Sequence, residues 1–252
     1  MEYLIILYSS LVIVAICAGF IDTLAGGGGL ITVPAILITG INPVMALGTN
    51  KLQSAIGELS ASLYFIKKSK ISYKKLSWAV SYTIIGASLG TVFLQIIPTE
   101  KLEKIIPWLL LFVLIYYVVN LRKKNMERNS ELIVDNKKFF FLGNGIGFYN
   151  GFFGPGTGSV WAICMMKFFK LDLQKATIYS KPLNLAGNVT ALSIFIIGGK
   201  INFLLALLMG FGSYLGGKLG AKFIVYKDIK WLKIIFLVLM AASTIATFIK
   251  YI

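Results

Sequence analysis

Long apolar stretches limit what this chain can fold into. Several approach or exceed the roughly 20 residues that a helix needs to cross a bilayer core: Tyr3–Phe20, Leu76–Ile97, Ile105–Val119, Ile201–Val225 and Trp231–Ile249. Hydrophobic residues make up 57% of the 252 residues, and the mean hydropathy is +0.81. Because a lipid-facing chain without barrel patterning must satisfy its backbone groups in helices, the sequence predicts an all-α, polytopic membrane protein.

The basic residues fit this class. The net charge of +15 lies largely in short Lys and Arg runs between apolar segments, as cytoplasmic loops require, and no aromatic-interleaved basic domain points to nucleic acid. Cys17 and Cys164 both fall in apolar segments, so neither predicts a disulfide or a metal cage. The chain has no histidine, which excludes His-based catalysis and His-rich metal sites. We expect no enzyme activity and no cofactor.

An internal repeat covers nearly the whole chain. Ala18-Gly19-Phe20-Ile21-Asp22 resembles Ile146-Gly147-Phe148-Tyr149-Asn150, and the glycine run at 26–29 resembles Gly154-Pro155-Gly156-Thr157-Gly158. Further matches join positions that lie 130 residues apart, including Lys51 with Lys181. We predict a first repeat at 1–121, a basic cytoplasmic linker at 122–138 and a second repeat at 139–252.

Each repeat contains about five hydrophobic segments, which gives eight to ten membrane segments in total. The second segment of each repeat is short (Leu30–Thr39 and Ser159–Phe169), whereas the third is long (Pro43–Ile66 and Leu173–Ile197). Basic residues lie on opposite sides of equivalent segments in the two repeats, so loop charge predicts inverted halves in the plasma (inner) membrane, with both termini outside. Inverted repeats are typical of secondary transporters, whose sites lie near the midplane.

A polar stripe runs along each long third segment. Lys51, Ser54 and Glu58 form the first stripe, and Lys181, Asn184 and Asn188 form the second. Steps of three and four residues place each trio on one helix face. Polar and charged groups inside a membrane usually mark a substrate path, although serine and asparagine also bond helices together.

The lysines and the acids suggest an anion site. Two ammonium groups without evident carboxylate partners would attract an anion, preferably a dianion, unless they only snorkel to the interface. Pro182 removes a backbone donor beside Lys181 and suits a discontinuous helix. Glu58 and Asp22 stand where the other repeat has amides, which makes them candidates for proton coupling or for a structural hydrogen bond.

The glycine runs predict helix breaks with close backbone approach. A short helix that starts after such a run directs free N–H groups toward a ligand, unless the glycines serve only in tight packing. The candidate binding residues are therefore the loop glycines together with the polar stripes: Gly26, Gly27, Gly28, Gly29, Asn50, Lys51, Ser54, Gly154, Gly156, Thr157, Gly158, Ser180, Lys181, Asn184 and Asn188.

These motifs resemble the TauE/SafE family of sulfite exporter and 4-toluenesulfonate uptake permease-like membrane proteins. The resemblance rests on A-G-F-I-D-T-L-A-G-G-G-G-L-I-T-V-P, A-L-G-T-N-K-L, G-F-F-G-P-G-T-G and A-T-I-Y-S-K-P-L-N-L-A-G-N, and it extends over essentially the full chain. It implies transport of anionic sulfur compounds across the plasma membrane, in a direction that the family does not fix. Family members often have small residues where this chain has Lys51 and Lys181.

The sequence thus predicts a secondary anion transporter that works by alternating access, driven by protons or by the membrane potential. Its expected partners are a small anionic substrate and the lipid bilayer, with homo-oligomerisation left open. An anion channel with the same stripe, or a non-transporting membrane subunit or sensor, are the alternatives.

Overall fold

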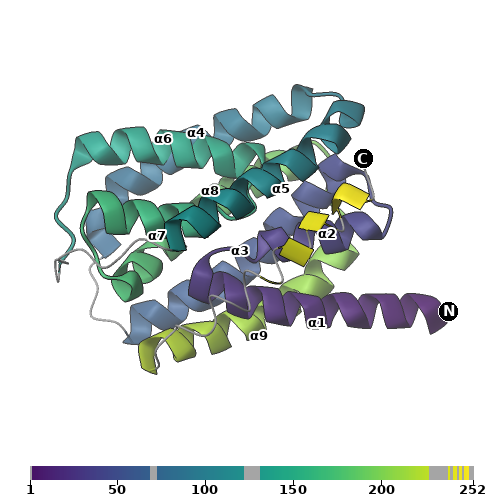
Figure 1. The fold of residues 1–252 in the computed structure, drawn as a ribbon, viewed down its shortest axis with the longest axis horizontal. Helices are drawn as coiled ribbons and strands as arrows, with labels where there is room; N and C mark the ends of the chain where they lie inside the picture. Colours follow the sequence, from purple (N-terminus) through teal and green to yellow (C-terminus); the bar gives the residue numbers. More distant parts are fainter. Residues whose placement is uncertain are drawn as a thin grey trace.

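The computed structural model describes residues 2–68, 73–121, 131–226, 238, 241–242, 244–245 and 247–249, and within these ranges the regular structure is helical, with no strand (Figure 1). The described helices are α1 (Glu2–Ala25), α2 (Gly29–Ile38), α3 (Pro43–Lys68), η1 (Tyr73–Leu76), α4 (Ser77–Ile96), α5 (Thr99–Leu121), α6 (Asn136–Phe152), α7 (Thr157–Phe168), α8 (Leu173–Ile197) and α9 (Phe203–Tyr226). The predicted all-α class is confirmed for this part of the chain.

Both glycine runs break a helix where the sequence predicted a break. α1 ends before Gly26, whose φ of 75° is costly for other residues, and α2 begins at Gly29. In the second half α6 ends before Gly154 and Gly156, with φ of 97° and 83°, and α7 begins at Thr157. At about 1.5 Å per residue, α2 with 10 residues and α7 with 12 are too short to cross a membrane alone.

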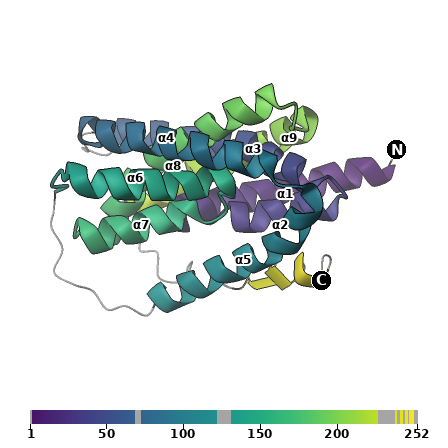
Figure 2. The ribbon, with the colours of Figure 1, turned by 90° about the horizontal axis from the view of Figure 1, so that it is seen from above.

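Two helix pairs make the closest contacts, α4 with α6 and α1 with α9. Small residues permit this approach, because a Cβ atom added at Gly86 or Gly90 of α4 would meet backbone atoms of α6. A Cβ atom at Gly216 of α9 would likewise meet the backbone of α1. α3 packs on α9, α8 packs on α4 and α7, and α3 and α8 touch each other. In Figure 2, α6 and α7 lie on one side of the molecule and α1 and α2 on the other.

The outer surface suits lipid. Large apolar side chains such as Ile96, Phe141 and Ile197 are 73%, 73% and 87% exposed. Among the described residues, three helices are long and apolar enough to cross a membrane by length and composition: Ile5–Ala25, Lys74–Ile96 and Phe203–Val225. The chain is therefore a helical membrane protein, while the eight to ten membrane segments stay a prediction.

Some sequence predictions fall outside the described residues. The predicted last apolar segment at Trp231–Ile249 is described only at scattered positions, and residues 122–130 of the basic linker are not described. Where the linker ends, α6 begins at Asn136, three residues before the predicted start of the second repeat. Asp135 caps this helix, because its side chain accepts a hydrogen bond from the Lys138 N–H at 3.1 Å.

Candidate functional site

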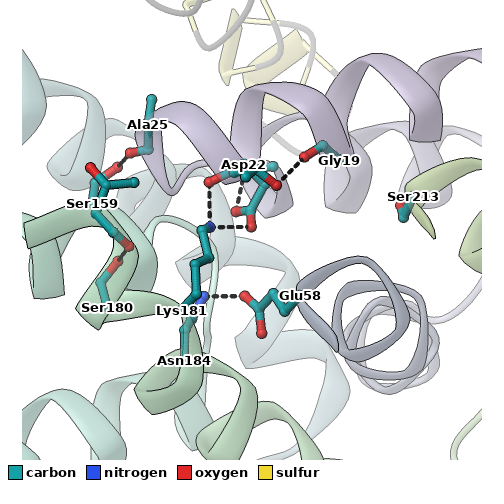
Figure 3. A network of polar contacts seen from close by, with 12 residues as sticks. Gly19, Asp22, Ala25, Glu58, Ser159, Ser180, Lys181, Asn184 and Ser213 are labelled. Carbon is teal, nitrogen blue, oxygen red and sulfur yellow. Dashed lines mark hydrogen bonds and ion pairs between the residues drawn. The ribbon is translucent and has the colours of Figure 1, made fainter. Parts of the chain in front are cut away.

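The polar stripes of α3 and α8 meet at the centre of the molecule, beside the loops that join α1 to α2 and α6 to α7 (Figures 1 and 3). The four charged side chains at this centre are Asp22, Lys51, Glu58 and Lys181. The two lysines are 1% and 0% exposed and Glu58 is 2% exposed. Desolvating charged groups is costly unless they are paired or hydrogen-bonded, so the contacts of each one matter.

Lys181 forms a direct ion pair with Asp22 of α1. Its Nζ lies 2.8 Å from Asp22 Oδ2 and also donates to the Asp22 carbonyl oxygen (Figure 3). The other carboxylate oxygen of Asp22 accepts a hydrogen bond from Gly28 N–H at the start of α2, at 2.9 Å. The prediction that both lysines lack a carboxylate partner is therefore wrong for Lys181. α8 also continues through Pro182, so the predicted discontinuity of this helix is wrong.

Lys51 has the equivalent neighbours in the other half, but they are neutral. Its Nζ donates to the carbonyl oxygen of Asn150 at 2.5 Å and to Asn150 Oδ1 at 2.6 Å. It also donates to Asn188 Oδ1 at 3.1 Å. Because Asn150 takes the place that Asp22 has beside Lys181, the two half-sites share their geometry and differ in charge.

Glu58 is bound by two amides of α8. Asn188 Nδ2 donates to Glu58 Oε2 at 2.9 Å, and Asn184 Nδ2 donates to Glu58 Oε1. Glu58 thus contacts another helix, one of the two roles that the sequence left open for it. When both acids are ionised, the two lysines and the two acids give the cluster no net charge.

The two glycine loops touch each other at the same centre. Ser159 N–H at the start of α7 donates to the Gly26 carbonyl oxygen at 3.0 Å, and its hydroxyl donates to the Ala25 carbonyl oxygen. A Cβ atom at Gly26 would overlap the backbone of Gly158 and Ser159, so only glycine fits there. The predicted close backbone approach is confirmed, and here the partner is the other loop.

A narrow cavity with room for about one water-sized molecule lies among these groups. Of the predicted site residues, most line it: Asp22, Gly26, Gly29, Asn50, Ser54, Glu58, Gly154, Gly156, Thr157, Asn184 and Asn188. Gly28 lines an adjoining small cavity with Asp22, Ser54 and Glu58. The two lysines do not line this cavity, but each contacts a residue that does. Lys181 Nζ contacts Asp22, and Lys51 Nζ contacts Asn188.

Three predicted residues lie elsewhere. Ser180 donates its hydroxyl to the Thr177 carbonyl oxygen of its own helix at 2.8 Å. Gly158 packs against Gly26, and Gly27 accepts a backbone hydrogen bond from Leu30 in the first turn of α2. The structure thus brings most of the candidates together, and their role in binding stays a prediction.

Two residues of the site, Asn150 and Gln53, are not among the predicted binding residues. Asn150 was recognised as the repeat partner of Asp22, and that match was the signal that should have placed it in the site. Gln53 of α3 accepts from Asn50 Nδ2 at 2.8 Å and donates to the Ser213 hydroxyl of α9. It lies off the predicted stripe, so its only sequence signal was a polar residue in a membrane segment.

Comparison with known proteins finds relatives along nearly the whole chain. The family model described as sulfite exporter TauE/SafE matches residues 11–247. A probable membrane transporter protein of Haemophilus influenzae is 38% identical over 218 residues, which cover 85% of this chain and 84% of that protein. Probable membrane transporter protein YfcA of Escherichia coli K12 is 34% identical over 240 residues, 95% of this chain and 88% of the relative. Probable membrane transporter protein ORF9 of Sinorhizobium sp is 36% identical over 242 residues, covering 95% and 91%. No solved structure matches the chain.

Proposed function

Because the chain belongs to the sulfite exporter TauE/SafE family, we propose that it is a secondary transporter of small anions, namely sulfur oxyanions or organosulfonates. The observation that carries this proposal is the cluster of two lysines with amide and carboxylate side chains at the centre of an apolar helical protein. Such groups are costly in a membrane and are typical of an ion or substrate path.

The packing supports two inverted halves around this site. The first helix of each repeat packs on the fourth helix of the other, as α1 does on α9 and α6 does on α4. The lysine of each third helix reaches the first helix of the other half, at Asn150 and at Asp22. This reciprocity favours repeats at 1–121 and 139–252 that are joined by the basic linker at 122–138. We place both chain termini outside the plasma membrane, as the loop charges favour.

The same packing suggests which parts move. We group α1, α2, α3 and α9 in one body and α4, α6, α7 and α8 in the other, with α3 and α8 meeting across the boundary, so each body takes helices from both repeats. The contacts between the bodies include the polar ones of the site, such as Lys51 with Asn150 and Lys181 with Asp22. Alternating access then consists of separating these bodies on one side at a time. Because the cavity has room for about one water, an anion enters only after such a movement.

Two disulfides distinguish this movement from one between sequence halves, in a protein whose Cys17 and Cys164 are replaced by serine. Gly210→Cys with Ile56→Cys places Cβ atoms 3.7 Å apart, within disulfide range, and links α9 to α3 across the halves but inside one body. Oxidation of this pair is expected to leave transport intact. Loss of transport, reversed by reduction, would contradict the proposed bodies.

A matching disulfide joins the two bodies. Gly29→Cys with Pro155→Cys places Cβ atoms 3.4 Å apart and links the two glycine loops. Oxidation of this pair is expected to stop transport, and reduction is expected to restore it. Unchanged transport with the loops linked would show that the loops do not separate during the cycle.

Proton coupling has two candidates in the site, Glu58 and Asp22. The four charges of the cluster cancel when both acids are ionised, so protonation of either acid leaves one positive charge to attract an anion. We propose that a proton accompanies the substrate, and that the proton gradient or the membrane potential drives transport.

Ligand binding tests the substrate class directly. A ligand that binds only the folded state raises the melting temperature by mass action. We expect sulfite, thiosulfate or a small sulfonate to stabilise the detergent-solubilised protein in a concentration-dependent way, while matched chloride controls do not. If none of these anions shifts the melting temperature at millimolar concentration, the proposal fails and a role as a membrane subunit or sensor is favoured.

A further inference from the structure

The two lysines of the site differ in the charge of their hydrogen-bond partners. The chain supplies its own anion to Lys181, because the carboxylate of Asp22 lies at 2.8 Å and is also held by Gly28 N–H at the start of α2. Among the described residues, the hydrogen-bond partners of Lys51 are neutral oxygens, from Asn150 and Asn188. Of the four ion pairs found in the described residues, none includes Lys51. An incoming anion therefore has one buried cation to approach.

Five side chains form a hydrogen-bonded ring: Lys51, Glu58 and three asparagines that connect them in two arms. One arm runs from Lys51 through Asn188, whose oxygen accepts from the lysine at 3.1 Å and whose amide nitrogen donates to Glu58 at 2.9 Å. The other arm runs through Asn150, which donates from Nδ2 to Asn184 Oδ1 at 3.0 Å, and then from Asn184 to Glu58. Both arms point their oxygens toward the cation and their N–H groups toward the carboxylate.

This orientation depends on the charge of Glu58. An ionised carboxylate only accepts hydrogen bonds, whereas a protonated one also carries an O–H donor. Where that O–H points along one arm it meets an N–H group that cannot accept it, and the bond forms once the amide of that arm turns its oxygen toward Glu58. The turned arm then presents N–H donors to Lys51, and the ammonium loses an oxygen partner. Donors that converge on one point form an anion site.

We propose that this ring binds one proton at Glu58 together with one monovalent anion beside Lys51, while the Lys181–Asp22 pair stays a fixed ionic contact. The inference rests on the proposed transport function and names its substrate charge. A proton on Glu58 leaves the cluster with a charge of +1, and a monovalent anion returns it to zero. A dianion would leave a buried negative charge, so the dianion preference expected from two unpaired lysines does not hold.

The other charged groups around Glu58 fit this assignment. Those that act on it electrostatically are Asp22 of α1, Lys181 of α8 and Lys51 of its own helix. α9 contributes the Ser213 hydroxyl to the adjoining cavity. Asp22 and Lys181 neutralise each other at 2.8 Å, which leaves Lys51 as the charge that responds to protonation of Glu58.

The test measures binding of methanesulfonate and sulfate to the purified full chain in lipid nanodiscs, by calorimetry between pH 5.5 and 8. Methanesulfonate stays a monovalent anion throughout this range, so any pH dependence belongs to the protein. We expect methanesulfonate to bind more tightly than sulfate. In the pH range in which binding takes up one proton, we expect the affinity for methanesulfonate to fall about tenfold for each unit by which the pH rises.

Variants separate the parts of the ring. Glu58→Gln is uncharged and carries an NH2 donor group beside an acceptor oxygen, much as the protonated acid carries an O–H beside a carbonyl, and is expected to bind methanesulfonate without pH dependence. Asn150→Asp gives Lys51 the carboxylate that Lys181 already has, and is expected to weaken binding at least about tenfold. The matched control combines Lys75→Gln with Glu131→Gln, which removes an ion pair at the surface away from the site, and is expected to keep both the affinity and its pH dependence.

The outcomes distinguish this inference from the proposed function. Wild-type protein that binds neither anion contradicts the transport proposal and the ring together. Wild-type protein that binds anions without pH dependence, or prefers sulfate, contradicts only the ring. The same holds if Glu58→Gln keeps the pH dependence or if the control variant loses it. Should Asn150→Asp fail to fold, the comparison of wild type with Glu58→Gln still decides the question.

Discussion

Removing one member of the Lys181–Asp22 pair provides a quantitative test of the site's internal charge balance. Lys181 is 0% exposed and its ammonium lies 2.8 Å from Asp22, whose side chain is 17% exposed. Lys181→Met keeps the length and the apolar stem of the side chain but leaves Asp22 with an uncompensated charge. Breaking a buried ion pair in this way costs about 3–5 kcal/mol.

A second substitution supplies the control. Asp22→Asn in the Lys181→Met background removes the stranded charge and keeps an oxygen that can accept from Gly28 N–H, the bond now 2.9 Å long. Replacing both members of a buried pair is often nearly neutral. We therefore expect the double variant to recover most of the stability that the single variant loses.

The assay is thermal unfolding of the purified protein in detergent, followed by intrinsic fluorescence. For a chain of this size, 1 kcal/mol shifts the melting temperature by about 2–4 °C, so Lys181→Met is expected to melt roughly 6–20 °C lower. A single variant that melts with the wild type would refute the reasoning, and so would a double variant that is no more stable than the single one.

Three further predictions concern packing. Gly26→Ala is expected to prevent stable folding, since its Cβ would overlap the backbone of the facing loop. The control Gly40→Ala has a similar φ of 86° but no atom within 4 Å of its Cβ, so it should cost only about 1 kcal/mol of backbone strain. Relative yields and melting temperatures of the two variants check this. Gly90→Ala is expected to lower the melting temperature by separating α4 from α6, while Gly145→Ala, with open space around it in a helix, should stabilise by about 1 kcal/mol. Trp161→Phe is expected to change stability little. It removes an indole N–H that is buried without a hydrogen-bond partner among the described residues, and this gain offsets the cavity that the smaller ring leaves; a nearly equal melting temperature agrees, and a large loss contradicts it.

Local sequence signals predicted the helices and the breaks between them. Gly26, Gly154 and Gly156 adopt the positive φ values that only glycine takes easily, so the breaks around them follow from residue type alone. The apolar period and length of α1, α4 and α9 likewise follow from local composition. Pro182 shows the limit of such signals, because α8 continues through it.

Contacts between distant segments were harder to predict. Lys181 meets Asp22 across 159 positions of sequence, and only the fold decides that this partner lies within reach of the ammonium group. The internal repeat carried part of the missing information: it aligned Asp22 with Asn150 and Lys51 with Lys181. It did not show that the fourth helix of each repeat packs on the first helix of the other, which determines where the two half-sites meet.

Flux of a labelled sulfonate or sulfite into proteoliposomes tests the central claim, anion transport by alternating access, most directly. We expect uptake that saturates with external anion, is accelerated by unlabelled anion inside, and is lost in Lys51→Met. Uptake that rises linearly without saturation and ignores internal anion would indicate a channel, and the absence of protein-dependent flux would contradict the claim.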